Sequence, residues 1–544
     1  MLAGGGAMAR KLPIGIQSFE SIRQDGYAYI DKTAYVYRLT HEGKPYFLSR
    51  PRRFGKSLLV STMRAYFEGR RELFAGLDIE RLEEAAAEGE GRERWVARPV
   101  FLFSFNGGDY TREGGLEAKL DELLRGLEET WGDEWSDLQA GSRLRRLLER
   151  AHAQSGPRVA VLVDECDKPL LEAMEDPELV ERSRAALKAF YSVLKDADDH
   201  LRFAFLTGVT KFSKVSIFSD LNQLSDVSLE RDYAGICGVT EAELLATFGP
   251  ELDALAAQLG LGADGCLEAL RAQYDGYCFH PDGPAAEGGA PDGRRVYNPF
   301  SLLNALQKRR LGSWWFESGT PTFLVRRMRD AGLNPRRLTD GTIYATERRL
   351  GDYRGDDPDP IPLMFQAGYL TIRAADPWTG AYALAVPNGE VRYGLTKGLL
   401  PAWAPGYDAA RGTDVLTLLD LVEDGDADGM RDVLAALFAS IPYTREDDPF
   451  ENYFQAVIWL VFELLGRYVR CEVRQARGRV DVVVEATSHV YVMELKRDGT
   501  AEEALAQIDE RGYAAPFAAD SRQLHLIGCA FDSRTRLLAD WLER

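Results

Sequence analysis

The sequence predicts an α/β protein: a parallel sheet with helices on both faces, then a mostly helical middle region, then a second, small α/β unit. Three observations support this prediction. Short apolar runs alternate with helical patterns up to about residue 210, the pattern becomes mainly helical after Thr240, and a separate series of strands and helices begins near Asp448. A chain of 544 residues also exceeds what one hydrophobic core usually serves, so we expect several domains.

Four apolar runs in the N-terminal part have the length of strands. They lack polar–apolar alternation, as fully buried parallel strands do. The predicted strands are Pro45–Leu48, Val100–Phe105, Val159–Val163 and Phe203–Leu206. Helical patterns lie between them at Leu58–Phe67, Leu116–Trp131 and Ser183–Leu194. This alternation indicates a parallel sheet covered by helices.

The later elements divide the chain further. We expect helices at Glu241–Leu259 and Cys266–Tyr274, a loop at Pro281–Arg295, strands at Ala367–Ala374 and Gly380–Val386, and two helices within Leu416–Ile441. The expected domains are a disordered N-terminus (1–10), the sheet domain (11–240), a helical lid or winged-helix-like middle region (241–400), a helical connector (401–447) and the last α/β unit (448–544).

Composition limits the possible functions. The net charge of −19 is unfavourable for binding nucleic acid, although basic clusters such as Arg50–Arg53 and Arg326–Arg337 could form local basic surfaces. The six cysteines are scattered without close pairs, which argues against disulfides and zinc sites and fits a reducing cytoplasm. A catalytic metal would therefore be held by carboxylates, which favours Mg²⁺ or Mn²⁺. No apolar stretch approaches the ~20 residues that span a membrane.

The segment Arg50–Ser57, which we call the phosphate loop, carries the strongest motif. It reads RPRRFGKS between a predicted strand and a predicted helix, and its end matches the G-K-[ST] half of a P-loop, while Arg50 replaces the first glycine. Lys56 would contact the β and γ phosphates of ATP, and the Ser57 hydroxyl would bind Mg²⁺. The alternative is an ordinary helix start capped by serine. The residues expected to surround the phosphates are Arg52, Arg53, Phe54, Gly55, Lys56, Ser57 and Leu58.

A second pattern supports nucleotide binding. The predicted strand at Val159–Val163 leads into Asp164 and Glu165, as in a Walker B motif. Asp164 would hold Mg²⁺ through water, and Glu165 would orient the attacking water. Thr207 is positioned to contact the γ-phosphate, although a Thr-Gly strand exit is also a common turn. Candidates for an arginine finger are Arg52, Arg53 and Arg231.

The last unit carries a possible metal site. Asp481 lies in one predicted strand, and Glu494 and Lys496 lie on one face of the next, about 6.5 Å apart along the chain. In this D-x₁₂-E-x-K arrangement, the two carboxylates would bind Mg²⁺ and Lys496 would orient a water or stabilise negative charge. Gln507 and Glu451 could complete the site. The alternative is a solvated strand end.

These motifs resemble a known family. The phosphate loop, the run Asp164–Pro169 (DECDKP) and Tyr297-Asn298-Pro299 are similar to the AAA-ATPase-like family of P-loop proteins. That family commonly ends in a PD-(D/E)XK nuclease-like domain, which the last unit also resembles. The resemblance implies a P-loop NTPase sheet, a restriction-endonuclease-like C-terminal domain and ATP binding, and it implies that the missing first glycine is the family's own form.

The leading hypothesis is an ATPase coupled to a Mg²⁺-dependent nuclease, with DNA rather than RNA as the expected partner and a homo-oligomer left open. One alternative is a nucleotide-gated switch whose C-terminal unit binds nucleic acid or a protein without cleavage. Another is an interaction protein that binds nucleotide without turnover. The aromatic cluster Trp314–Phe316 is expected to pack in the core, although a base-stacking platform is the alternative.

Overall fold

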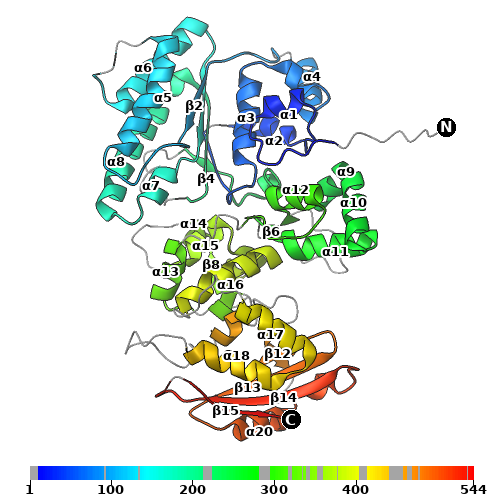
Figure 1. Ribbon diagram of the computed structural model, residues 1–544. Helices are drawn as coiled ribbons and strands as arrows, with labels where there is room; N and C mark the ends of the chain where they lie inside the picture. Colours follow the sequence, from blue (N-terminus) through cyan, green and yellow to red (C-terminus); the bar gives the residue numbers. More distant parts are fainter. Residues whose placement is uncertain are drawn as a thin grey trace, which may run out of the picture. The chain divides into compact units, whose positions relative to one another are not determined.

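In a computed structural model, the chain forms two compact units (Figure 1). Unit 1 contains residues 1–315 and 341–390, and unit 2 contains residues 316–340 and 391–544. The structure describes residues 10–43, 45–90, 93–132, 135, 137–211, 223–280, 295–315, 322–333, 335–338, 343–351, 359–376, 378–403, 413–439, 457–461, 469–475, 478–535 and 537–544. The segment predicted to be disordered, residues 1–10, lies outside the described residues except for Arg10. Glu451 also lies outside them.

The core of unit 1 is a parallel sheet with the strand order β2-β3-β4-β1-β5. The four predicted strands are confirmed as β1 (Tyr46–Ser49), β2 (Val100–Ser104), β3 (Val159–Asp164) and β4 (Leu201–Gly208). Every residue of β3 is buried, because helices cover both faces of a central strand. The edge strand β5 (Ser225–Asp226) was not predicted, since two residues show no periodicity.

Helices cover both faces of this sheet, as predicted. Figure 1 shows α5, α6 and α8 grouped on one face and α1 to α4 on the other. The first group is α5 (Gly115–Trp131), α6 (Ala140–Ser155) and α8 (Pro177–Asp196), with the short α7 (Lys168–Glu172) beside it. The second group is α1 (Phe19–Gln24), α2 (Thr33–Glu42), α3 (Lys56–Phe67) and α4 (Asp78–Glu90).

The next part of unit 1 is helical, as predicted, with one correction. The helix expected at Glu241–Leu259 is two helices, α9 (Glu241–Thr247) and α10 (Gly249–Leu259). Pro250 explains the break, because it lies in the first turn of α10, has no N–H to continue the hydrogen bonds of α9, and its ring clashes with the carbonyl group four residues earlier. With α11 (Ala263–Tyr274) and α12 (Pro299–Lys308), these helices enclose a separate hydrophobic cluster that includes Leu244 and Leu270.

Small antiparallel sheets complete unit 1. Strands β6 (Tyr277–Cys278) and β7 (Arg295–Val296) pair, and β8 (Ile343–Thr346), β10 (Ala381–Ala385) and β9 (Thr371–Ala375) form a three-stranded sheet in that order. The strand predicted at Ala367–Ala374 was placed too early, because Ile361–Ala367 forms helix α15 after the short α14 (Glu347–Gly351). Gly368, with φ 89°, ends α15 in the left-handed conformation that favours glycine.

Unit 2 is built on a mixed sheet in the order β11-β12-β13-β14-β15. The strands are β11 (Val469–Gln475), β12 (Gly478–Glu485), β13 (His489–Arg497), β14 (Gln523–Phe531) and β15 (Leu538–Glu543). The two strands predicted to carry Asp481 and Glu494 are confirmed as β12 and β13. The two helices expected within Leu416–Ile441 are confirmed as α17 (Thr413–Asp424) and α18 (Ala427–Ala439), and α20 (Ala501–Arg511) lies between β13 and β14. Helix α13 (Thr322–Asp330) also belongs to unit 2, and α16 (Gly389–Trp403) begins at the end of unit 1.

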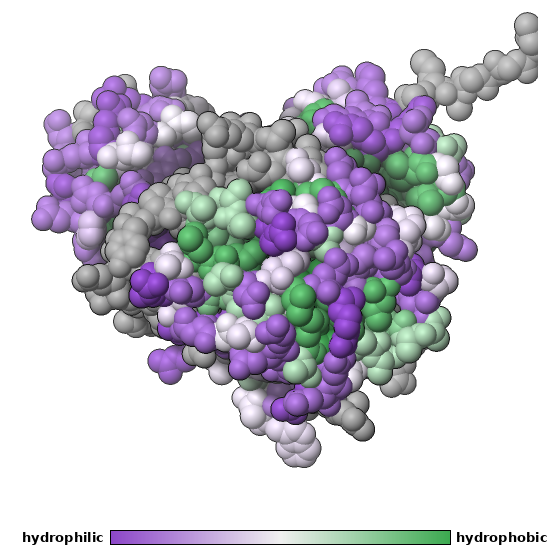
Figure 2. Space-filling model, turned by 60° about the horizontal axis from the view of Figure 1, so that its bottom comes forward, coloured by the Kyte–Doolittle hydropathy of each residue, from purple (hydrophilic) through white to green (hydrophobic). Residues whose placement is uncertain are grey.

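No helix among the described residues is both long enough and apolar enough to span a bilayer. The face drawn in Figure 2 is mainly hydrophilic, with separate hydrophobic areas between the polar side chains.

Candidate functional site

The phosphate loop connects the end of β1 to the start of α3, as the sequence predicted. Gly55 precedes the first helical residue, Lys56, and has a φ of 93°. An added Cβ at Gly55 would meet no heavy atom within 4 Å, so space lies open beside the loop backbone. The first N–H groups of a helix have no partner within the helix, and they attract anions. Glycine is required here by its backbone conformation.

The side chain of Lys56 points back to the start of the phosphate loop. Its side chain is buried, and its Nζ donates hydrogen bonds to the carbonyl oxygens of Arg50 (2.8 Å) and Pro51 (3.0 Å). Burial lowers the pKa of Lys56, and the negative charges of Asp167 and Asp164 oppose that shift. The structure therefore places a buried ammonium group beside two carboxylates at the carboxyl edge of the sheet.

Asp164 and Ser57 lie together next to this ammonium group. Asp164 ends β3 and is 5% exposed. Burial raises its pKa, while a hydrogen bond with the Ser57 side chain and the charge of Lys56 act in the opposite direction. Its Oδ1 is buried without a hydrogen-bond partner among the described residues, and so is the Oγ1 of Thr207 in β4. Two buried oxygens on neighbouring strands thus have unused capacity to bind a hydrated cation or a donor.

Glu165 follows Asp164 and has an unusual backbone, with φ 55°. Non-glycine residues seldom adopt this left-handed conformation, which often occurs at functional sites. Its carboxylate lies 3.5 Å from the Nζ of Lys168, which also donates to Oδ1 of Asn106 at 3.1 Å. Asn106 follows β2, so the acid is held between the carboxyl ends of β2 and β3.

Asp167 is a site residue for which the sequence suggested no role. It is 3% exposed, and its Oδ2 accepts hydrogen bonds from Val209 N (3.0 Å), Thr210 N (2.6 Å) and Thr210 Oγ1 (2.8 Å). A Cβ on Gly208 would clash with its Oδ1. Asp167 thus fixes the segment that follows β4 against the segment that follows β3, and it keeps Thr207 near Asp164. Its place in the DECDKP run was the only sequence signal.

The arginines of the phosphate loop have different environments. Arg50 is 1% exposed, donates to the carbonyl oxygens of Ser228 (2.7 Å) and Tyr233 (2.9 Å), and stacks 4.0 Å from the ring centre of Phe279. It therefore holds the loop in place where most P-loops have a glycine. Arg52 is exposed, and so is Arg231 in the 3-10 helix Arg231–Tyr233.

Arg53 is the third arginine of the loop and is partly buried. It donates to the carbonyl oxygens of Trp314 (2.8 Å) and Trp315 (3.3 Å). Both tryptophans are buried, which confirms core packing for them rather than an exposed base-stacking surface. Phe316 lies outside the described residues.

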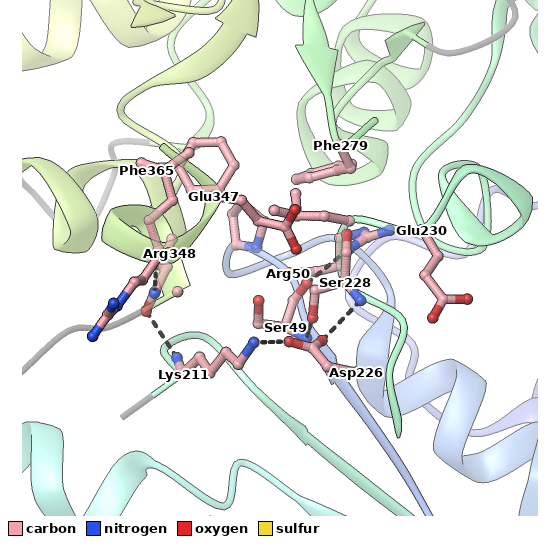
Figure 3. A pocket seen from close by; sticks show the side chains of 15 residues that line it. Ser49, Arg50, Lys211, Asp226, Ser228, Glu230, Phe279, Glu347, Arg348 and Phe365 are labelled. Carbon is pink, nitrogen blue, oxygen red and sulfur yellow. Dashed lines mark hydrogen bonds and ion pairs between the residues drawn. The ribbon is translucent and has the colours of Figure 1, made fainter. Parts of the chain in front are cut away.

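A cavity of about 600 Å³ adjoins the start of the phosphate loop (Figure 3). Arg50, Ser228 and Phe279 line one side, and Lys211, in an ion pair with Asp226, lines another. Lys211 N also donates to Gln366 Oε1 at 2.8 Å, which links the end of β4 to α15. The cavity lies at the β5 side of the loop, whereas Lys56, Ser57 and Asp164 meet between β1 and β3.

In unit 2, the predicted metal-site residues also meet. The register of β12 and β13 pairs Val482 with Met493, which places Asp481 beside Glu494. Leu495 N donates to Asp481 Oδ2 at 2.9 Å, and Asp481 N lies 3.5 Å from Glu494 Oε2. Gln507 on α20 donates to Glu494 and accepts from Lys496. The four side chains thus form one polar cluster beside the hydrophobic residues that pack against α20.

The electrostatics of this cluster favour a bound cation. Glu494 is 3% exposed. Burial, followed by the negative charge of Asp481, raises its pKa to about 8. A divalent cation between the two carboxylates would offset both effects, and oxygen ligands suit Mg²⁺ or Mn²⁺. Among the described residues, however, no group of three or more His, Cys, Asp or Glu side chains is arranged to hold a metal, so water or substrate oxygens would have to supply further ligands.

Comparisons with known proteins match both parts of the chain that carry these residues. A family described as "Predicted AAA-ATPase" matches residues 13–218, and one described as "PD-(D/E)XK nuclease superfamily" matches residues 449–541. The chain is also similar to a protein of Azotobacter chroococcum mcd 1 named "Uncharacterized protein in vnfD 5'region", with 40% identity over 540 residues that cover 97% of each chain.

Proposed function

Because the chain belongs to the predicted AAA-ATPase family and carries a C-terminal domain of the PD-(D/E)XK nuclease superfamily, we propose that it is an ATP-hydrolysing protein coupled to a metal-dependent nuclease. The expected substrates are ATP in unit 1 and nucleic acid, DNA rather than RNA, in unit 2. The observation that carries the proposal is the convergence of Lys56, Ser57 and Asp164 at the carboxyl edge of β1 and β3.

Each residue of the ATP site has a role that its position supports. The first amides of α3 and the Lys56 ammonium group would hold the β and γ phosphates. Ser57 and Asp164 would hold Mg²⁺, which neutralises the developing phosphate charge. Glu165 would orient the attacking water, and Thr207 would contact the γ-phosphate. Arg52 is the exposed arginine nearest to these groups in sequence, and we keep it as an arginine-finger candidate.

The nuclease site is proposed on the same basis. Asp481 and Glu494 would hold Mg²⁺, which polarises the phosphodiester and lowers the pKa of a bound water. Lys496, positioned by Gln507, would orient that water or stabilise the negative charge that develops on the phosphate. Residue Glu494 must be ionised to hold the cation, so metal binding at neutral pH would displace a proton from it.

The test measures the two activities separately on the full chain. Lys56→Ala should abolish ATP hydrolysis, and a Lys56→Ala protein that hydrolyses ATP at the wild-type rate would contradict the first half. Asp481→Asn and Lys496→Ala should abolish Mg²⁺-dependent cleavage of single- or double-stranded DNA while ATP hydrolysis continues. Absence of cleavage of any nucleic acid by wild-type protein, with either Mg²⁺ or Mn²⁺, would contradict the second half.

A second candidate is a nucleotide-gated switch whose unit 2 binds nucleic acid or a protein without cutting. The net charge of −19 favours a protein partner for this switch, because binding to a phosphate backbone normally requires a basic surface. The presence of only two carboxylates in the described part of the metal site also favours it. ATP-dependent retention of DNA, with equal amounts of intact DNA before and after incubation, would support this candidate.

A further inference from the structure

Arg53 holds an unusual conformation in the phosphate loop. Its φ is 65°, in the left-handed region that non-glycine residues rarely adopt. Such a conformation persists only where surrounding contacts enforce it. The contacts here are the hydrogen bonds to the carbonyl oxygens of Trp314 (2.8 Å) and Trp315 (3.3 Å), and the ring of Phe300, whose centre lies 4.1 Å from the guanidinium carbon. The shape of the loop therefore depends on the Trp314–Trp315 segment.

Trp315 makes a further contact with the loop. Its indole Nε1 donates to the carbonyl oxygen of Arg52 at 3.3 Å. Trp314 is anchored on its other side, because its Nε1 contacts the hydroxyl of Tyr274 at 3.1 Å. Two consecutive loop residues, Arg52 and Arg53, are thus bound by two consecutive tryptophans. The connection is polar and directional, so a displacement of the tryptophans must alter the loop or break these hydrogen bonds.

Glu390 fixes the same two tryptophans from the opposite side. It lies in the first turn of α16, is 1% exposed, and its Oε1 accepts hydrogen bonds from the backbone N–H groups of Trp314 (2.5 Å) and Trp315 (2.8 Å). Arg53 therefore binds the carbonyl groups of the dipeptide and Glu390 binds its amides. A buried carboxylate that accepts two amide hydrogens is costly to displace.

Trp315 and Glu390 lie where the chain passes from unit 1 to unit 2. The chain leaves unit 1 for unit 2 after Trp315 and again after Glu390. The two segments that lead into unit 2 are therefore joined to each other by Glu390 and to the phosphate loop by Arg53. All the contacts lie within unit 1, so they do not depend on how the two units are arranged.

We propose that Glu390 is a positioning residue for the phosphate loop and that it couples nucleotide binding to unit 2. Its contacts with Trp314 and Trp315, which in turn bind Arg53, connect the loop to the two segments that lead into unit 2. The inference rests on the proposed ATP site, since phosphate binding is what would change the loop. It does not require unit 2 to be an active nuclease.

The experiment uses the full chain and measures nucleotide affinity together with amide hydrogen exchange in β13 and α20, with and without saturating Mg²⁺–ATP analogue. In the wild type, the nucleotide should change exchange in unit 2. In Glu390→Gln and Arg53→Met, affinity should fall by roughly tenfold, and the exchange response in unit 2 should disappear even when nucleotide is saturating. A role limited to stabilising the fold would not remove that response.

The matched control is Glu241→Gln. Glu241 is also a buried acid of unit 1, but it pairs with Arg271 at 2.6 Å in the helical part. This variant should retain the wild-type affinity and exchange response. Because Glu390 and Arg53 act through one dipeptide, the double variant should bind nucleotide no more weakly than the weaker single variant. If Glu390→Gln does not fold, Arg53→Met carries the test alone.

Two negative results have different meanings. If the wild type binds nucleotide but exchange in unit 2 is unchanged, or if both variants respond as the wild type does, the coupling is refuted while the ATP site stands. If the wild type binds no nucleotide, the proposed function fails and the coupling fails with it.

Discussion

Glu494 provides a sharp prediction, because its protonation state decides how unit 2 binds metal. The pKa of about 8, raised by burial and by Asp481, means that the carboxyl group is mostly neutral at pH 7. A folded-state pKa raised above the ordinary value makes ionisation costly to the folded protein. This cost is absent below the ordinary value of 4.5 and reaches its full size above pH 8. A cation that requires the ionised form must displace the proton.

The magnitude follows from the titration curve. At pH 7 a group with a pKa of 8 carries about 0.9 proton, and at pH 9 it carries about 0.1 proton. Metal binding should therefore release about 0.9 proton at pH 7 and about 0.1 at pH 9. Below pH 8, metal affinity should increase about tenfold for each unit by which the pH is raised. A carboxyl group with the ordinary pKa would release almost no proton at either pH.

The assay is calorimetric titration of the full chain with Mn²⁺ in two buffers of different protonation enthalpy. Comparison of the two heats gives the number of protons released. Asp164→Asn is the control, because it removes the other buried metal-site carboxylate, in unit 1, and should leave the release unchanged. A release below about 0.2 proton at pH 7 at saturating Mn²⁺ would refute the reasoning.

Three further predictions concern unit 1. Glu165→Gln should retain ATP binding but lower the rate of ATP hydrolysis by about 10²–10³-fold, because the amide cannot act as a base. An unchanged rate in a phosphate-release assay would contradict this prediction. Arg50→Met should destabilise unit 1 by about 3 kcal/mol, since the carbonyl groups of Ser228 and Tyr233 lose a charged donor. An unchanged midpoint of urea unfolding, followed by tryptophan fluorescence, would contradict this prediction. Gly208→Ala should cost ~1–3 kcal/mol through its clash with Asp167, whereas Gly126→Ala, which meets no atom within 4 Å, should not destabilise the protein in the same assay.

Much of the fold was predictable because its signals are local. The strands β1 to β4 are continuous apolar runs, and the helices between them show helical periodicity, so composition and spacing suffice. The same holds for the phosphate loop and for Asp481, Glu494 and Lys496, where short spacings within or between adjacent strands bring the side chains together. Mistakes occurred where the pattern was short or ambiguous, as in β5 and α15.

The sequence by itself determined the identity of the chemical groups and the strands and helices that carry them. Tertiary structure alone decided that Arg50 is a buried anchor, that Asp167 joins the ends of β3 and β4, and that Glu390 and Arg53 bind the same pair of tryptophans. These contacts join residues far apart in the chain, and their hydrogen bonds depend on how the elements pack. Local periodicity carries no information about that packing, because it is set by the sheet order and by the burial of whole elements.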